Sequence, residues 1–269
     1  MNDLARTLAV AEREFRTLLG SRQFLALAVG FLLAVVGFVL AGAGDRGFVL
    51  LGLSLLTPLE VLLPVLAVAV GYRAILEDAR RGELDTLRTY PLSRYAYVGG
   101  VYLGRLAALL PTVLLALAVA GALTAVGAGP ATGVVASHTT VDSPLLYVRF
   151  VLLTEVYAAA LLAVAVALSS VVRSTVGALA AAATALLVLV VGFDLGLVGL
   201  LAGGDGPVPG ALVAASPNGA YRGLVLELVV HVVTPERLGA AATPVLSLGS
   251  LGLWTVLPLA LAAAAVWRD

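Results

Sequence analysis

Most side chains that enzymes use for covalent or metal chemistry are absent from this sequence or stand alone in it. Cysteine and lysine do not occur, the one methionine is the first residue, and the two histidines, His138 and His231, are far apart in the chain. Neither His-Glu-x-x-His nor Gly-x-Ser-x-Gly is found, so no zinc-hydrolase or serine-hydrolase centre is indicated. Without lysine the chain also lacks the residue that a phosphate-binding P-loop needs. We therefore expect no catalytic residue, no metal site and no cofactor held by this chain.

The densest group of charged side chains lies between residues 73 and 94. Leu84 and Leu87 are three residues apart and therefore share one face of a helix, with charged residues around them. An apolar anchor inside a charged rim is typical of a short helix that docks in a groove of a partner protein. A solvated helical hairpin with balanced charges is the alternative. The residues expected to dock are Glu77, Asp78, Arg80, Arg81, Gly82, Glu83, Leu84, Leu87, Pro91, Ser93 and Arg94.

A second group of charges lies inside apolar stretches, where one charge costs about 2.5–3.5 kcal/mol on insertion scales. Glu60 stands between Pro58 and Pro64, so it lines a path or gate, or else it is a packing carboxyl near carbonyls that the prolines free. Glu155 and Asp194 either face the same path or lie at the membrane interface. Arg105 and Arg149 are near the ends of apolar stretches, where we expect them to snorkel as anchors.

Composition indicates that a lipid bilayer surrounds the elements that position these residues. Hydrophobic residues make up 61% of the 269 residues, charged residues only 12%, and the mean hydropathy is +1.07. A soluble domain usually has about 25% charged residues. A spanning helix needs roughly 20 apolar residues, and the sequence predicts an all-α fold with six spans, at about 24–43, 48–72, 96–126, 145–168, 176–201 and 248–267.

The distribution of arginine predicts the orientation, because positively charged loops stay in the cytoplasm. With both termini inside, eleven arginines are cytoplasmic, whereas only Arg46, Arg222 and Arg237 are external, with Arg149 near an outer end. Residues Leu4 to Leu19 have an apolar face and a face with Arg6, Arg13 and Arg16, which predicts a helix along the cytoplasmic surface. A polar lead-in to the first span is the alternative. The formal net charge of zero favours no nucleic-acid partner.

The charged segment also carries a family resemblance. Gly82, Leu84, Leu87, Pro91, Ser93, Arg94 and Gly100 stand at the spacings of the loop between the second and third spans of ABC-2 type permeases. Glu83, Arg88 and Val101 depart from the usual residues of that motif. With Gly71 to Ile75 and Ser216 to Tyr221, the sequence looks closest to archaeal permeases grouped with the nitrous oxide reductase maturation permease.

The resemblance implies one transmembrane domain over residues 1–269, the permease subunit of an exporter in the plasma membrane. In such families the loop is a coupling helix that docks on a cytoplasmic ATPase subunit, which holds ATP and magnesium, and two permease copies form the path. The resemblance also implies broken outer helices between the last two spans, with Pro217 as a hinge and Tyr221 as an anchor beside the path. An external amphipathic helix is the alternative there, and an ATP-independent membrane scaffold is the alternative function.

Copper transport would be a natural expectation for that subgroup, which is associated with maturation of a copper enzyme. Soft copper carriers use cysteine and methionine, and this chain has no cysteine and only its first methionine. A copper relay along the chain is therefore not indicated, and the sequence points to no particular substrate.

Overall fold

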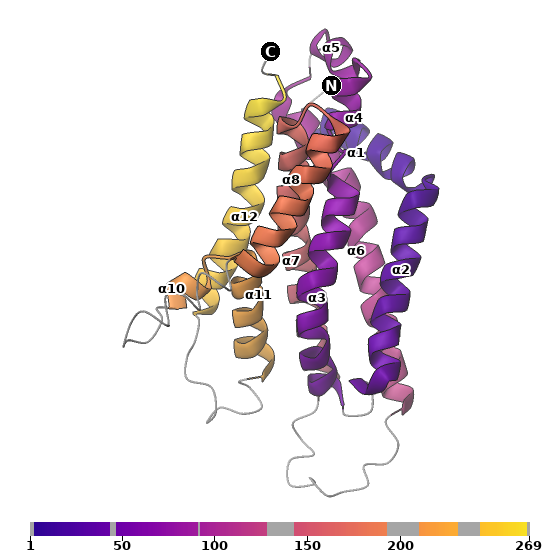
Figure 1. Ribbon diagram of the computed structural model, residues 1–269, viewed down its shortest axis with the longest axis vertical. Coiled ribbons are helices and arrows are strands. Elements are labelled where there is room, and N and C mark those ends of the chain that lie inside the picture. Colours follow the sequence, from indigo (N-terminus) through magenta and orange to yellow (C-terminus); the bar gives the residue numbers. More distant parts are fainter. Residues whose placement is uncertain are drawn as a thin grey trace, which may run out of the picture.

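The fold of the chain is a bundle of long helices. In a computed structural model, the structure describes residues 3–43, 47–90, 92–127, 143–192, 210–230 and 243–267, and within these ranges every regular element is helical. Figure 1 shows the long helices side by side, with the two termini at the same end of the bundle.

Five helical stretches are long and apolar enough to cross a membrane. They comprise α2 (Arg22–Phe38) with the π-helical segment η1 (Val39–Ala43), α3 (Phe48–Gly71), α6 (Arg94–Gly127), α7 (Pro144–Val171) and α12 (Pro244–Ala265). These correspond to five of the six predicted spans, although α12 begins four residues earlier than the sequence predicts. The predicted fifth span, 176–201, is described only as α8 (Thr175–Leu187) and the π-helical η3 (Val188–Gly192). Its remaining residues lie outside the described ranges, so the count of six stays a prediction.

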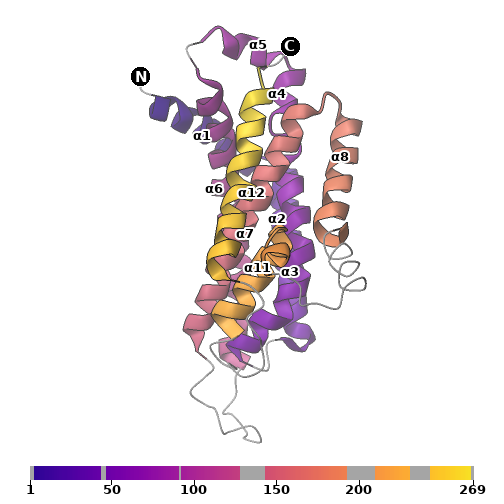
Figure 2. The ribbon, with the colours of Figure 1, turned by 90° about the vertical axis from the view of Figure 1, so that its left-hand side faces the viewer.

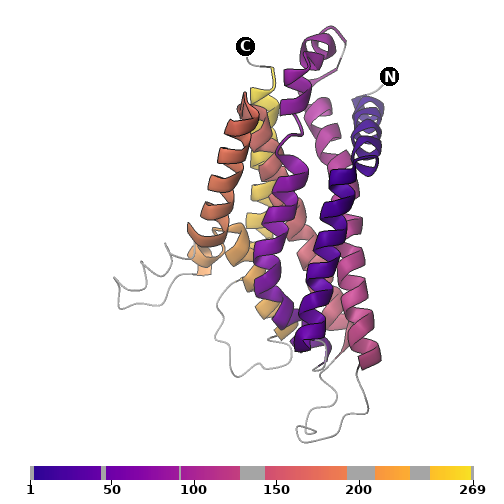
Figure 3. The ribbon, with the colours of Figure 1, turned by 45° about the vertical axis from the view of Figure 1, so that its right-hand side comes forward.

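Shorter helices lie at the two ends of the bundle. The end with the termini holds α1 (Asp3–Leu19), α4 (Leu76–Arg80) and α5 (Glu83–Arg88) (Figure 1). Figure 3 views α1 almost along its axis, beside the ends of α2 and α6, so α1 lies across the long helices. Towards the other end lie α10 (Gly210–Val213), α11 (Pro217–Val225) and the π-helical η4 (Leu226–Val230) (Figures 1 and 2).

Local sequence explains where several of these helices begin. A serine side chain at the N-cap accepts a hydrogen bond from a free backbone N–H of the first turn, as Ser21, Ser143, Ser174 and Ser216 do at the starts of α2, α7, α8 and α11. Proline follows the cap in three cases, Pro144, Pro217 and Pro244, where its missing N–H costs nothing. The helix α11 consequently starts at Pro217.

The core lies where α3 packs on α7, and glycine sets the closest approach. A Cβ at Gly71 would lie 2.5 Å from the Cβ of Ala165, so no larger residue fits there without a shift. Leu51, Leu55 and Leu59 of α3 are fully buried. Large apolar side chains on the outward faces stay exposed, among them Leu33 of α2, Leu40 of η1, Leu114 and Leu115 of α6, and Leu253 and Leu257 of α12. Exposed apolar surface over so many helices is what a lipid environment requires.

Candidate functional site

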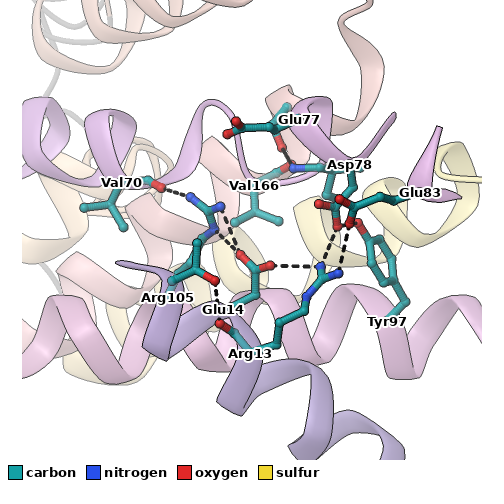
Figure 4. A network of polar contacts seen from close by, with 12 residues as sticks. Arg13, Glu14, Val70, Glu77, Asp78, Glu83, Tyr97, Arg105 and Val166 are labelled. Carbon is teal, nitrogen blue, oxygen red and sulfur yellow. Dashed lines mark hydrogen bonds and ion pairs between the residues drawn. The ribbon is translucent and has the colours of Figure 1, made fainter. Parts of the chain in front are cut away.

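Arg13 joins the N-terminal helix to the charged segment that the sequence analysis singled out. Its Nη2 lies 2.6 Å from Asp78 Oδ2 of α4, and its Nη1 lies 3.2 Å from Glu83 Oε2 of α5. The same Nη2 lies 3.0 Å from Oε1 of the neighbouring Glu14. Figure 4 shows this fork, in which one guanidinium reaches three carboxylates. The contact holds α1 against both short helices at this end of the bundle.

Glu14 carries the network on into the long helices. Arg105 of α6 places Nε 3.1 Å and Nη2 3.0 Å from Glu14 Oε2, a two-nitrogen contact that fixes direction as well as charge. Arg105 also donates through Nη1 to the backbone carbonyl of Val70 near the end of α3 (Figure 4). The side chain of Arg105 is only 12% exposed, so it is a buried link between α1, α3 and α6. The expectation that Arg105 snorkels to water is therefore wrong, because the partner carboxylate of α1 reaches into the bundle.

Tyr97 completes the polar network at Asp78. Its hydroxyl donates to Asp78 Oδ2 at 2.7 Å, and both residues are buried. The ring of Tyr97 stacks on Trp267, just after α12, with centroids 5.8 Å apart. Asp78 therefore receives hydrogen bonds from α1 and α6 together, while the tyrosine ring brings the C-terminal end of the chain to the same place.

Electrostatics favours a permanently charged Arg13. Burial alone would lower the pKa of its guanidinium, but the hydrogen bond and attraction to Asp78, followed by those to Glu14, raise that pKa above its ordinary value. An ion pair of this kind is costly to separate, because removing one partner leaves a poorly solvated charge behind.

Gly100 of the motif and Gly104, both on α6, explain how α1 comes so close. A Cβ on Gly100 would lie 2.6 Å from Val10 Cβ, and a Cβ on Gly104 would lie 2.4 Å from the carbonyl oxygen of Ala11. The two glycines are four residues apart and therefore lie on the same face of α6. They form the shallow seat in which α1 rests, which places Glu14 within reach of Arg105.

The predicted docking residues that the structure describes lie at this end of the bundle. Asp78 and Glu83 hold the network described above, Glu77 pairs with Arg81 at 2.5 Å, and Arg80 donates to Thr175 Oγ1 at 2.5 Å. Gly82, which has a φ of +71° between α4 and α5, makes a turn that other residues adopt only with strain. Ser93 caps α6 through its side-chain oxygen, which accepts from the Ala96 N–H, and Arg94 is exposed. Pro91 and the side chain of Leu87 lie outside what the structure describes.

Of the two predicted apolar anchors, Leu84 is the one whose side chain the structure describes. Its side chain is partly buried and packs against the core of this chain. Only the remaining part of that side chain is free for a partner, so a docking contact would combine Leu84 with the exposed charges of α4 and α5.

A second polar cluster lies around α11. Glu60 of α3, predicted from its position between two prolines, accepts two hydrogen bonds from Arg222, Nε to Oε1 at 2.8 Å and Nη2 to Oε2 at 2.5 Å. The side chain of Glu60 is 4% exposed and that of Arg222 is 42% exposed. The carboxylate of Glu60 is thus buried, and the partly exposed guanidinium of Arg222 compensates its charge.

Aromatic residues hold α11 against α7. The ring of Tyr221 lies parallel to that of Tyr157 of α7, with centroids 4.5 Å apart and an interplanar angle of 2°. The hydroxyl of Tyr221 lies 2.8 Å from Thr154 Oγ1, and Tyr157 donates to the side-chain oxygen of Asn218. With Glu60 on α3, these contacts bind α11 between two long helices.

The structure brings together some of the four predicted path residues and leaves one apart. Glu60 contacts α11 through Arg222, Tyr221 is the next residue to Arg222 in α11, and Pro217 is the buried first residue of that helix. Glu155 follows Thr154 on α7, but both its carboxylate oxygens are buried without a hydrogen-bond partner among the described residues. Asp194 lies outside the described ranges. Arg149 is exposed and donates to the Leu228 carbonyl at 3.4 Å, so it too is tied to the segment after α11.

Neither cluster has the make-up of a catalytic or metal centre. In the described parts of the chain no three histidine, aspartate or glutamate side chains are placed to hold a metal ion. The carboxylates of both clusters face arginines and hydroxyl groups instead. What the geometry does provide is mechanical linkage, in which charged pairs connect short helices at each end to the long helices.

Sequence reasoning missed four members of these clusters as functional residues: Arg13, Glu14, Tyr97 and Arg222. The sequence does contain a signal that could have singled out Glu14: it is a carboxylate, next to Arg13, on a helix predicted to lie on a membrane surface. For Arg222 the signal was misleading, because it counted as an external loop arginine. Its partner Glu60 is 162 residues away, and no local pattern connects the two.

Comparison with known proteins gives one match over nearly the whole chain. The family model described as ABC-2 family transporter protein matches residues 8–268. No curated protein matches the chain.

Proposed function

Since the chain belongs to the ABC-2 family of transporter proteins, we propose that it is the permease subunit of an exporter driven by a separate cytoplasmic ATPase. Members of this family are membrane transport subunits that normally work with such an ATPase. In the proposed arrangement both termini and the α4–α5 segment face the cytoplasm, in the plasma membrane. Two copies of the chain form the path between them, and the subgroup that we propose, from the resemblance of the sequence, is that of the archaeal permeases grouped with the nitrous oxide reductase maturation permease.

The observation that carries the proposal is the fork of Arg13. A docked ATPase would press on α4 and α5, whose Asp78 and Glu83 are held by Arg13 at 2.6 and 3.2 Å. Glu14 passes the displacement to Arg105 of α6, and Arg105 passes it to the end of α3 through Val70. Movement of two short helices would in this way reach α1 and the two long helices α6 and α3 without first breaking a buried ion pair.

The α11 cluster is the proposed gate. Alternating access requires a segment that holds two positions, and α11 is short, capped at Ser216 and held by polar contacts at Glu60 and Thr154. Polar contacts with defined geometry suit a gate, because they can be exchanged as a set rather than deformed gradually. Glu155, with its unpartnered carboxylate oxygens, is the proposed contact for substrate or water once α11 moves.

Replacing Arg13 with glutamine tests the transmission step. The variant Arg13→Gln should still insert and still co-purify with the ATPase, because the residues assigned to docking are unchanged. Its ability to alter the hydrolysis rate of the bound ATPase in reconstituted vesicles should fall by about tenfold or more, since a charged link between α1 and both short helices is lost. The readout needs no knowledge of the substrate.

Arg16→Gln is the matched control for this experiment. Arg16 is on the same helix, three residues further on, but its side chain is 77% exposed, and its ion pair within the described part of the chain is to Glu12 on its own helix. Exposed pairs of this kind contribute little, so this variant should behave as the unaltered protein. Normal coupling in Arg13→Gln would reject transmission through α1. Failure of the unaltered chain to bind any P-loop ATPase would favour the ATP-independent scaffold instead.

A further inference from the structure

A basic cavity lies between the segment after α3 and the first residue of α8. Its volume is about 260 Å³, and its lining is Arg73, Leu76, Glu77, Arg80, Arg81 and Thr175. Three guanidinium groups and one carboxylate give the lining a formal charge of +2. The cavity adjoins the polar network around Arg13, because Nη1 of its lining residue Arg81 lies 3.9 Å from Oε1 of Glu83, which Arg13 also contacts.

Each arginine side chain of the cavity contacts a neighbouring residue. Arg81 is drawn to Glu77 at 2.5 Å, and Arg80 donates to Thr175 Oγ1 at 2.5 Å. Arg73 lies over the ring of Tyr72, 5.0 Å from its centroid, and its Nε is buried without a hydrogen-bond partner among the described residues. A buried donor without a partner is unfavourable, so an acceptor that reaches this nitrogen would be bound favourably.

The start of α8 adds to the positive potential. Thr175 is the first residue of this 13-residue helix, and the N-terminus of a helix carries a partial positive charge and free backbone N–H groups. The helix dipole and the three guanidinium groups therefore act on the same small volume. An anion with several acceptor oxygens fits this arrangement better than a single carboxylate does.

The surroundings indicate that the anion is attached to a membrane lipid. Figure 2 shows α8 at the edge of the bundle, and its outward residues Val176, Leu179 and Leu187 are 79%, 53% and 66% exposed. An acyl chain could lie along this apolar face while its headgroup enters the cavity. The cavity is slightly smaller than the roughly 300–1,000 Å³ of pockets for whole small molecules, as expected for a site that takes only a headgroup.

We propose that this cavity binds the phosphate of an anionic phospholipid from the leaflet on the side of α4 and α5. Basic pockets between helices on the cytoplasmic side of membrane proteins take such headgroups, so the leaflet assignment rests on the orientation in the proposed function. Arg80 and Arg81, which were assigned to ATPase docking above, would then donate at least some of their N–H hydrogen bonds to the lipid. Bound lipid would hold the α4 segment against α8.

Native mass spectrometry of the detergent-solubilised chain tests this directly, with phosphatidylglycerol as the probe and phosphatidylcholine as the uncharged reference. The unaltered protein should retain phosphatidylglycerol in preference to phosphatidylcholine. Removing one arginine near a membrane surface should weaken anionic lipid binding roughly fivefold, so Arg73→Gln and Arg80→Gln should each lose that factor. Arg16→Gln, an exposed arginine outside the cavity, should lose none.

Three outcomes would overturn the inference. One is undiminished phosphatidylglycerol binding in both cavity variants, and another is equal loss in Arg16→Gln, which would indicate unspecific attraction. The third is displacement of the lipid by millimolar inorganic phosphate, which would make the ligand a soluble anion. Arg73 is outside the docking set, so Arg73→Gln should still co-purify with the ATPase. If it loses the ATPase but keeps the lipid, the cavity is a protein contact, whereas loss of lipid alone leaves the proposed function untouched.

Discussion

The pair Glu60–Arg222 offers the sharpest test of the α11 cluster, because its two partners are buried to different extents. Arg222→Gln leaves a carboxylate whose side chain is 4% exposed, and an uncompensated buried charge of this kind costs about 3–5 kcal/mol. Glu60→Gln leaves an arginine that is 42% exposed and can turn towards water, so the loss should be nearer the 1 kcal/mol of an ordinary hydrogen bond. We expect the arginine variant to be the less stable of the two.

Thermal unfolding in detergent, followed by tryptophan fluorescence, measures this difference. For chains of this size about 1 kcal/mol corresponds to roughly 2–4 °C in Tm, so a loss of about 3–5 kcal/mol in Arg222→Gln should lower Tm by about 6–20 °C, and Glu60→Gln should lower Tm by about 2–4 °C. The double variant should be more stable than the sum of the two losses predicts, because neither charge is then left alone. Arg149→Gln is the control, since Arg149 is exposed and its contact to Leu228 is 3.4 Å long.

The reasoning would be refuted by equal losses in the two single variants, or by strictly additive losses in the double variant. Either result would mean that the carboxylate of Glu60 is solvated without Arg222. The cluster would then be a set of independent contacts, and the proposal of a gate that moves as a set would lose its physical basis.

Two further variants test the seat of α1 and the docking surface. Gly104→Ala should push α1 away from α6 and lower Tm, because the new Cβ would lie 2.4 Å from the Ala11 carbonyl oxygen and overpacking costs about 1–3 kcal/mol. Gly99→Ala is the control and should leave Tm nearly unchanged, because its Cβ would lie 3.8 Å from the nearest atom. Equal Tm values in the two variants would reject the seat of α1. Leu84→Asp combined with Leu87→Asp should abolish permease-dependent ATP hydrolysis in vesicles while leaving membrane insertion intact, since it removes the apolar anchor; unchanged hydrolysis would count against docking there.

Much of the fold follows from patterns that are local in the sequence. An apolar run of about 20 residues forms a spanning helix because its own backbone must satisfy every hydrogen bond in lipid. For this reason the ends of α3, α6 and α7 lie within a few residues of the predicted limits. Serine and proline at the helix starts affect only the first turn of their own helix, and Gly82 affects only the backbone turn that it forms between α4 and α5. The sequence therefore predicted the five spans that the structure describes and the family to which the spacing of its motif pointed.

Side-chain partners, by contrast, were decided only by the tertiary structure. Arg13 meets Asp78 across 65 positions and Arg222 meets Glu60 across 162. Counting charges placed Arg222 among external loop residues, and periodicity placed Arg13 on the outer face of an amphipathic helix. Which carboxylate each one reaches depends on how closely whole helices pack, and that packing depends on glycines such as Gly104 in another element. Hydrophobic periodicity reports how one helix meets its surroundings, whereas an ion pair requires two helices to be placed relative to each other.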